Sequence, residues 1–295
     1  MRRVVGLAFI WGWSFLFIKV AVRGMTPSTV AFGRITLGMV VLVTVLRLKG
    51  LSMPRDLQTW RHFAVMGLLY SALPFTLLAW AEQPGRATSA LAAVVNASTP
   101  LFAAIFAALV LSERLRPAHL AGLLVGFVGV GVAAGVGGAD LASSSFSGVL
   151  AVIAASACYG FSFGYAQRSL AGIPPVIAAC GQLITAALFV APVAAFTTAT
   201  HGIALNGRIV VSITLLGAVG TGYAYILNYR SIAEIGPTRA SLVTYLVPVV
   251  AVTVGVVFLG EAFHIRLVAG GLLIVLGIAL LQDRISRLRR VPAAA

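Results

Sequence analysis

Several polar and aromatic side chains lie inside long apolar stretches, where they could contact a ligand. One group combines two aromatic rings with a hydroxyl at the spacing i, i+3 and i+4, which brings the three onto one face of a helix. The group occurs twice, as Trp11, Ser14 and Phe15 and as Tyr159, Ser162 and Phe163. Further candidates of this kind are Trp80, Asn96, Tyr223, Asn228 and Tyr245. Together they suit a small amphipathic ligand, although each ring could equally pack in the core or at the lipid interface.

Two cations, Lys19 and Arg34, also fall within apolar stretches, where an ionisable group is costly and is a functional candidate by default. Each could bind a substrate carboxylate or line an outer gate. Each could instead extend to the outer headgroups or to a helix C-terminus. The acidic residues all lie at the ends of the apolar stretches or between them. Because a proton-coupled exporter of cations usually needs a deep carboxylate, that class is disfavoured.

Two prolines and two glutamates have expected structural roles. Pro100 and Pro248 lie within apolar stretches, where proline removes a backbone hydrogen bond and frees a carbonyl. Freed backbone is tolerated in a membrane only where protein or a cavity satisfies it, so each proline marks a hinge, a cavity wall or a packing kink. Glu113 and Glu261 each precede a helix start, where a carboxylate can cap free N–H groups.

Other reactive groups give weak signals. The run 160–164 reads Gly-Phe-Ser-Phe-Gly and matches the GxSxG pattern of serine hydrolases, with Ser162 as the nucleophile. That pattern requires a strand–turn–helix context with acid and histidine partners, whereas here it lies in an apolar helical stretch. Cys158 and Cys180 have no disulfide or metal-ligand spacing, and the sequence contains no GxxxxGKS/T phosphate loop. We therefore expect no metal, no cofactor and no enzymatic activity.

The elements that position these residues follow from the composition. The chain has 295 residues, of which 60% are hydrophobic and 9% charged, with a mean hydropathy of +1.03. A soluble domain is about 45–50% apolar and about 25% charged, so soluble, disordered and disulfide-stapled classes are excluded. Stretches of about 20 apolar residues cross a bilayer as helices. Ten such spans are predicted, near 4–22, 28–48, 62–82, 88–111, 118–136, 152–170, 176–196, 210–230, 236–259 and 266–284.

The net charge of +14 indicates how these spans are oriented. Of the 21 Lys and Arg residues, 15 fall on one side of the ten-span arrangement, 4 fall on the other and two lie inside spans. Cytoplasmic loops carry the excess of Lys and Arg, so both termini are predicted to be cytoplasmic. The basic excess therefore reports membrane topology, and a nucleic-acid-binding function is disfavoured.

The chain contains an internal repeat at a constant offset of 148 residues. The offset aligns Gly, Pro and Glu residues without a gap, including the pairs Gly12/Gly160, Pro100/Pro248 and Glu113/Glu261. It defines two units of five spans each, 1–147 and 148–295. Because five is odd, the second unit enters the membrane from the opposite face, as in many secondary transporters. The predicted fold is an all-α integral membrane protein of ten helices in two inverted halves.

Taken in order, these motifs resemble the drug/metabolite transporter superfamily, in particular its ten-helix EamA-type exporters. The resemblance is carried by Trp11-Gly12-Trp13-Ser14-Phe15, Lys19, Pro27, Arg34, Pro100, Leu111-Ser112-Glu113, Gly122, Gly126 and Gly129, and in the second half by Pro248, Leu259-Gly260-Glu261, Gly270 and Gly277. It implies two EamA repeats, a central cavity and export of small metabolites, and some similar members export aromatic and other neutral amino acids. The second half departs from the first at Gln167 and Gln182, which correspond to Lys19 and Arg34.

We therefore expect a secondary transporter that exports small metabolites across the inner membrane by alternating access, with neutral and aromatic amino acids as the cargo. Two alternatives stay open, namely a nucleotide-sugar, organic-anion or drug carrier of the same superfamily and an intramembrane serine hydrolase. The expected partners are a small-molecule substrate and the lipid bilayer, with no nucleic acid. The protein is expected to act as a monomer.

Overall fold

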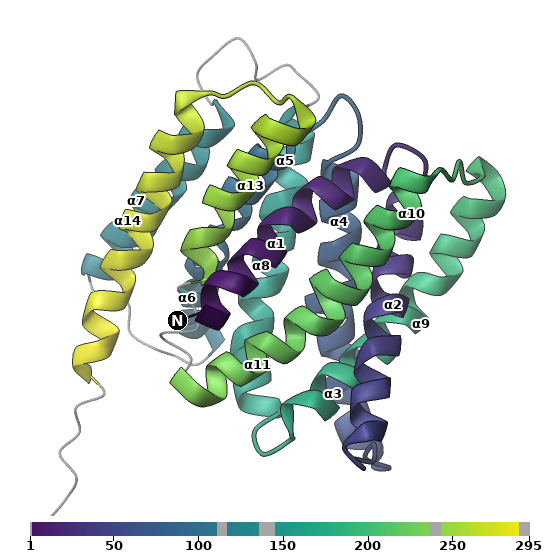
Figure 1. Cartoon of the computed structure of the whole chain (residues 1–295). Coiled ribbons are helices and arrows are strands. Elements are labelled where there is room, and N and C mark those ends of the chain that lie inside the picture. The colour runs from purple at the N-terminus through teal and green to yellow at the C-terminus, as the bar shows by residue number, and fades with distance from the viewer. Residues whose placement is uncertain (1, 111–116, 136–144, 236–242, 289–295) are drawn as a thin grey trace, which may run out of the picture.

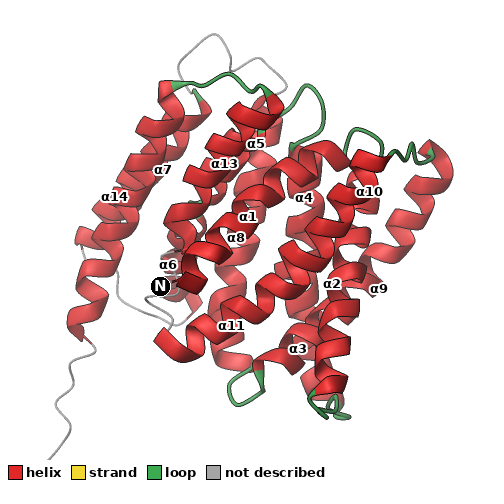
Figure 2. Ribbon diagram, viewed as in Figure 1, coloured by secondary structure: helices red, strands yellow, loops and turns green. Residues whose placement is uncertain are grey.

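The computed structural model describes residues 2–110, 117–135, 145–235 and 243–288 (Figure 1). Helices make up all the regular secondary structure of these ranges, as Figure 2 shows. Eight helical segments are long and apolar enough to cross a membrane, and two shorter apolar helices cover Val243–Leu259 and Ile265–Leu281. The all-helical prediction is therefore confirmed, while the count of ten spans and the orientation of the termini stay predictions.

Each predicted span contains at least one observed helix. In the first half these are α1 (Arg2–Ala21), α2 (Pro27–Leu48), α3 (Leu57–Gly67), η1 (Leu68–Ala72), α4 (Leu73–Ala81), α5 (Ser89–Asn96), α6 (Thr99–Val110) and α7 (Pro117–Ala134). In the second half they are α8 (Ser145–Ser169), α9 (Pro175–His201), α10 (Gly207–Thr214), η3 (Leu215–Tyr223), α11 (Ala224–Ile235), α13 (Val243–Leu259) and α14 (Ile265–Leu288).

Short polar side chains begin several of these helices. The Thr88 hydroxyl accepts the backbone N–H of Leu91 at the start of α5, at 3.1 Å. The carboxylate of Asp56 accepts the N–H of Thr59 at 2.7 Å and so caps α3. This hydrogen bond favours the ionised form and holds the pKa of the Asp56 carboxyl below its ordinary value. Each cap satisfies an N–H group that the helix itself leaves without a partner.

Two spans contain a π-helical segment at matching positions of the repeat. The segment η1 joins α3 to α4, and η3 joins α10 to α11. Adding the 148-residue offset to Leu68, where η1 begins, gives position 216, which lies inside η3. A π-turn adds a residue to the helical turn and so rotates the face that follows it. The side chains of α4 and α11 therefore do not continue the faces of α3 and α10.

Close helix pairs form the edges of the bundle. The helices α7 and α14 pack along their length at one edge, and α2 packs against α9 toward the other (Figure 1). Glycines allow the first contact, since a Cβ atom on Gly270 would lie 2.6 Å from the carbonyl oxygen of Gly129. Small residues at such crossings let two backbones approach closely in lipid.

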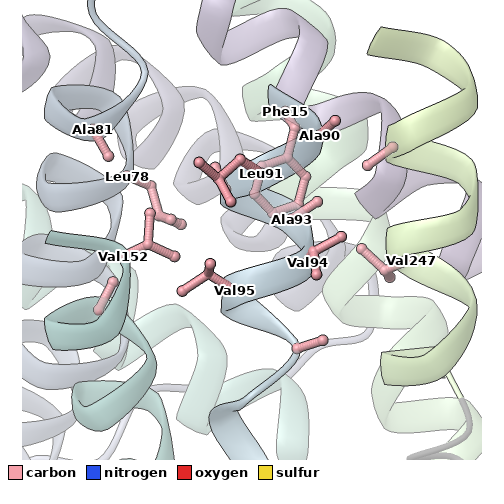
Figure 3. Close-up of a cluster of buried hydrophobic side chains, with 14 of the residues drawn as sticks. Phe15, Leu78, Ala81, Ala90, Leu91, Ala93, Val94, Val95, Val152 and Val247 are labelled. Carbon is pink, nitrogen blue, oxygen red and sulfur yellow. The ribbon is translucent and has the colours of Figure 1, made fainter. Parts of the chain in front are cut away.

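The centre of the bundle is an apolar cluster around α5. Every residue from Ser89 to Val95 is buried, and the side chains of Leu91 and Val95 point to one side of the helix while that of Val94 points to the other (Figure 3). They contact Phe15 of α1, neighbours on α4 and α8, and Val247 of α13. A helix that is apolar on all sides is typically buried on all sides. Accordingly, α5 packs against helices of both halves of the chain.

Candidate functional site

A cavity of about 370 Å³ lies among the central helices of both halves. Its wall takes residues from α1, α2, η1, α4, α5, α6, α8, α11 and α13. Most of the predicted ligand-binding residues lie on this wall, namely Trp11, Ser14, Phe15, Asn96, Tyr159, Phe163, Asn228 and Tyr245. Arg34, Pro100 and Pro248 lie on it as well. The structure thus brings into one chamber residues that are far apart in the sequence.

The α1 wall has the arrangement that its spacing predicted. Trp11, Ser14 and Phe15 all line the cavity, because α1 is a regular α-helix across these positions. The Ser14 hydroxyl donates to the backbone carbonyl of Ile10 at 3.1 Å, so its oxygen still has the capacity to accept a hydrogen bond. This face offers a ligand two rings and one acceptor.

The α8 wall retains only part of the matching group. Tyr159 and Phe163 line the cavity, whereas Ser162 is fully buried beside it. The Ser162 hydroxyl donates to the carbonyl oxygen of Cys158 at 2.7 Å, a bond within its own helix. A nucleophilic serine needs a base as its partner. The geometry of Ser162 is that of a structural serine in a helix.

A cluster of four aromatic side chains lines the same wall, and two of them, Tyr159 and Phe163, belong to the predicted set. The ring of Tyr70 lies 5.3 Å from that of Tyr159, 5.7 Å from that of Phe163 and 6.2 Å from that of Tyr225, measured between centroids. Tyr70 and Tyr225 are cavity-lining residues that the predicted set omits. Both lie in or after a π-helical segment, so a count of α-helical turns does not place them on this face.

Arg34 belongs to the same chamber and is 6% exposed. Its Nε donates to the hydroxyl of Thr221 in η3 at 2.8 Å. The central carbon of its guanidinium lies 3.8 Å from the centroid of the Phe75 ring, as in a cation–π contact. The side chain therefore stays inside the bundle and does not extend to the headgroups.

Lys19 has a different environment at one end of the bundle. It is not part of the cavity wall, and its Nζ donates to the carbonyl oxygen of Ala87 at 2.8 Å. The carboxylates of Glu82 and Glu261 are its electrostatic neighbours. Of the two predicted charge candidates, then, only Arg34 faces the cavity.

Two glutamates meet at Ser89, the first residue of α5. The Ser89 hydroxyl donates to Oε2 of Glu82 at 2.9 Å, and its backbone N–H donates to Oε1 of Glu261 at 2.7 Å. The N–H of Ala90 donates to the other oxygen of Glu261 at 3.0 Å. Glu261 thus caps α5 and not α14, the helix that follows it in the sequence. Its predicted counterpart, Glu113, lies outside the described residues.

The predicted hinge prolines occupy two different helical positions. The fourth span is broken between α5 and α6, and Pro100 is the second residue of α6, where a missing N–H costs little. Pro248 lies inside α13. Asn96, the last residue of α5, accepts a hydrogen bond from the Ser156 hydroxyl of α8 at 3.3 Å. The break therefore places the Asn96 side chain beside the cavity.

Two other predicted residues lie away from the wall. Trp80 lies near the end of α4, where the guanidinium carbon of Arg86 lies 3.3 Å from the centroid of the Trp80 ring. Tyr223, at the end of η3, is 49% exposed. In the part of the chain that the structure describes, no three His, Cys, Asp or Glu side chains gather in a way that could hold a metal ion.

Comparison with known proteins gives a consistent result. The sequence profile of the EamA-like transporter family matches residues 4–134 and 146–282. A solved crystal structure that is 25% identical superposes with a TM-score of 0.65, covering 97% of each chain. An uncharacterized transporter of Archaeoglobus fulgidus is 25% identical, covering 94% of this chain and 98% of its own.

Two further relatives have more specific names. The "probable terminal-alkyne amino-acid exporter" of Streptantibioticus cattleyicolor is 27% identical, and the match covers 95% of this chain and 92% of that protein. The uncharacterized inner membrane transporter YedA of Escherichia coli is 28% identical, and the match covers 86% of this chain and 81% of that protein. The match to the family profile extends through both halves of the chain and includes residues of every helix that lines the cavity.

Proposed function

The chain belongs to the EamA-like transporter family, and from that premise we propose that it exports small amphipathic metabolites, with neutral and aromatic amino acids as the principal cargo. It is a multi-pass membrane transporter, and its relatives include inner-membrane transporters. The direction and the cargo class are the parts that we add. They draw support from the relative named as an amino-acid exporter.

The observation that carries the proposal is the composition of the cavity wall. Rings from α1, η1 and α8 provide apolar surface, and the amides of Asn96 and Asn228 provide polar contacts. Pockets of this kind, mostly apolar with a few convergent polar groups, bind small molecules. An amino acid with an aromatic side chain presents both kinds of surface, so it matches this wall.

We further propose that the halves 1–147 and 148–295 are inverted repeats that rock against each other around the cavity. The packing of the helices supports this. The pairs α2 with α9 and α7 with α14 each join an element to its own counterpart. The pair α1 with α13 matches α8 with α6 under the 148-residue offset. A two-fold relation in the membrane plane produces such pairs and provides two equivalent ways to open the site.

A nucleotide-sugar carrier is less compatible with this chamber. Such a substrate carries a diphosphate, which proteins bind with several cations or a helix N-terminus. Arg34 is the single cation among the cavity-lining residues that the structure describes. The single positive charge of one guanidinium balances one carboxylate, but it does not balance two phosphates.

The test is counterflow in liposomes that contain the purified protein. A panel of labelled neutral, aromatic, acidic and basic amino acids is presented without nucleotide, with and without a proton gradient. We expect uptake of the neutral and aromatic members into preloaded vesicles. Exchange of none of the panel, alongside intact folded protein, would reject amino acids as the cargo.

A further inference from the structure

The guanidinium of Arg34 is the one charge on the cavity wall as described. At 6% exposure it has lost most contact with water, and none of the described cavity-lining residues carries a carboxylate. Glu82, which acts on Arg34 electrostatically, is not among them and accepts a hydrogen bond from Ser89. A buried charge is costly unless it is paired and hydrogen-bonded. A cation retained at such a place inside a membrane protein therefore indicates an anionic partner.

The contacts of Arg34 leave most of its hydrogen-bonding capacity unused. Thr221 takes the Nε–H and Phe75 covers one face of the plane, and both groups are neutral. Within the described ranges, the two terminal nitrogens make no hydrogen bond and the side chain forms no ion pair. A guanidinium has five N–H donors in a planar fork, so four remain for a partner.

The second half of the repeat shows that anchoring these helices does not need a charge. Gln182 of α9 corresponds to Arg34 and is 1% exposed. Its Nε2 donates to the hydroxyl of Ser71 in η1 at 2.8 Å, as Arg34 donates to a hydroxyl in η3. A neutral amide thus forms the equivalent helix-to-π-segment contact. The charge of Arg34 is therefore not needed for this contact.

The break between α5 and α6 also lies on the wall. The first turn of α6, with Thr99 and Pro100 on the chamber, carries a partial positive charge. The last turn of α5, with Asn96 and Ala97 on the same wall, carries the opposite partial charge, so the two helix ends offset each other. Arg34 alone therefore makes the chamber favourable to an anion and unfavourable to a ligand whose only charge is an ammonium group.

We infer, building on the proposed transport function, that Arg34 forms a carboxylate subsite and that the cargo class is small amphipathic monocarboxylates. Guanidinium and carboxylate form two parallel hydrogen bonds, which fixes the ligand's orientation. The ligand's side chain then lies against the rings of Tyr70 and Tyr159. In this arrangement the carboxylate is essential and the amine is dispensable.

Three indole compounds separate these contributions with the wild-type protein alone. Tryptophan has both charged groups, indole-3-propionate lacks the amine and tryptamine lacks the carboxylate. Each is tested as a competitor of labelled tryptophan in counterflow and for its effect on the melting temperature of the purified protein. We expect the first two to bind and tryptamine to bind at least about tenfold more weakly. Equal binding of tryptamine and tryptophan would overturn the inference.

Matched variants then assign the preference to Arg34. Arg34→Gln, which copies the residue of the second half, should weaken binding of both carboxylates by about tenfold to a hundredfold and leave tryptamine within about twofold. Arg34→Lys should retain part of the preference. Lys19→Gln removes the same charge outside the chamber and should leave the ratio unchanged. An Arg34→Gln protein that weakens all three ligands equally would identify Arg34 as a packing residue and reject the subsite.

The outcomes distinguish this inference from the proposed function. Binding of indole-3-propionate without exchange of any amino acid would keep the carboxylate subsite and reject amino acids as the cargo. Exchange of tryptophan with no preference over tryptamine would keep the amino-acid transporter and reject the subsite. A wild-type protein that binds none of the three compounds and exchanges none of the amino-acid panel would reject both.

Discussion

At the first turn of α5, one serine holds a carboxylate from each half of the chain. Ser89 contacts Glu82 through its hydroxyl and Glu261 through its backbone N–H. Glu82 is fully buried, and its other oxygen has no hydrogen-bond partner among the described residues. Lys19 lies close enough to lower the electrostatic cost of both acids. The interaction of Glu261 with α5 therefore links the two halves at one end of the cavity.

The first prediction concerns this link. Glu261→Ala should destabilise the protein by about 1–2 kcal/mol, because two N–H groups of α5 lose their acceptor. Gly255→Ala should act through the same contact, since its Cβ would lie 2.6 Å from Oε2 of Glu261. Thermal unfolding of the purified single and double variants measures both effects.

The double variant is the control for this mechanism. With the carboxylate already absent, Gly255→Ala should be neutral or stabilising, because alanine favours a helix over glycine by about 1 kcal/mol. Additive losses in the double variant would mean that Gly255 and Glu261 act independently.

The sequence predicts the α1 wall of the cavity better than the opposite wall. Trp11, Ser14 and Phe15 obey a regular helical period, so their shared face can be counted from the spacing. Tyr70 and Tyr225 cannot be placed in this way, because π-turns precede or contain them and change the face. The contact between Arg34 and Thr221 could not be predicted from spacing either, since the two residues are 187 positions apart in the chain.

Among the elements, α7 and α14 form a pair whose contact depends on glycine. At Gly270 an added Cβ would lie 2.6 Å from the backbone nitrogen of Ala133 and from the carbonyl oxygen of Gly129. Backbone atoms cannot move aside as the end of a side chain can. At the next position, Gly271, the nearest atom is a methyl group of Val94 at 3.8 Å.

The second prediction compares these neighbouring positions. Gly270→Ala should cost about 1–3 kcal/mol, because the two helices must separate. Gly271→Ala adds the same methyl group without a clash and should change stability by less than about 0.5 kcal/mol. Melting temperatures in detergent, with membrane expression levels, provide the measurement. Similar losses of stability at both positions would show that Gly270 does not act by allowing α7 and α14 to approach closely.

The third prediction concerns proline inside helices. Pro248 lies within α13 on the cavity wall, whereas Pro192 lies within α9 and away from it. Both interrupt the hydrogen bonds of their helices. Pro248→Ala should slow exchange more than it weakens ligand binding if α13 bends during transport, and Pro192→Ala should leave both unchanged.

Exchange rates and ligand affinities measured on the same preparations separate the two effects. Equal loss of rate and affinity in Pro248→Ala would indicate a role in folding. Pro100 should be the milder site of the two predicted hinges, because at the start of α6 a proline replaces no helical hydrogen bond.

Hydropathy predicts where the helical spans lie, but it does not predict breaks or π-helical segments inside them. The apolar runs predicted where α1, α2 and α9 begin and end to within a few residues. The break between α5 and α6 was not predicted, because Asn96, Ala97 and Ser98 do not reduce the hydropathy of the span enough to end it. The π-helical segments change geometry without changing composition, so they too leave no such signal.

For the whole molecule, the orientation in the membrane can be tested at two loops. The loop between α2 and α3 lies at one end of the bundle, and the loop between α9 and α10 lies at the other (Figure 1). The distribution of Lys and Arg predicts that the first loop is cytoplasmic and the second is external. The inverted-repeat proposal does not depend on which of them is outside, but the direction of export does.

The fourth prediction follows from that distribution. In a background without Cys158 and Cys180, Leu205→Cys in the second loop should react with a membrane-impermeant thiol reagent in intact cells. Leu205 is 60% exposed, so the position is accessible. Ser52→Cys in the first loop should react only after the membrane is opened. The reverse pattern would invert the assigned topology.

The solitary charge of Arg34 also determines which step of each transport cycle responds to the voltage across a membrane, while the charge of the cargo sets the net effect. The described cavity wall carries one positive charge when empty, none with a bound monocarboxylate and one with a bound zwitterion. Moving one elementary charge through 100 mV changes its energy by about 2.3 kcal/mol. A cell interior that is electrically negative would therefore drive amine-free acids outward while leaving amino acids to follow their concentration gradient. Currents across a planar bilayer should be present with indole-3-propionate and absent with tryptophan.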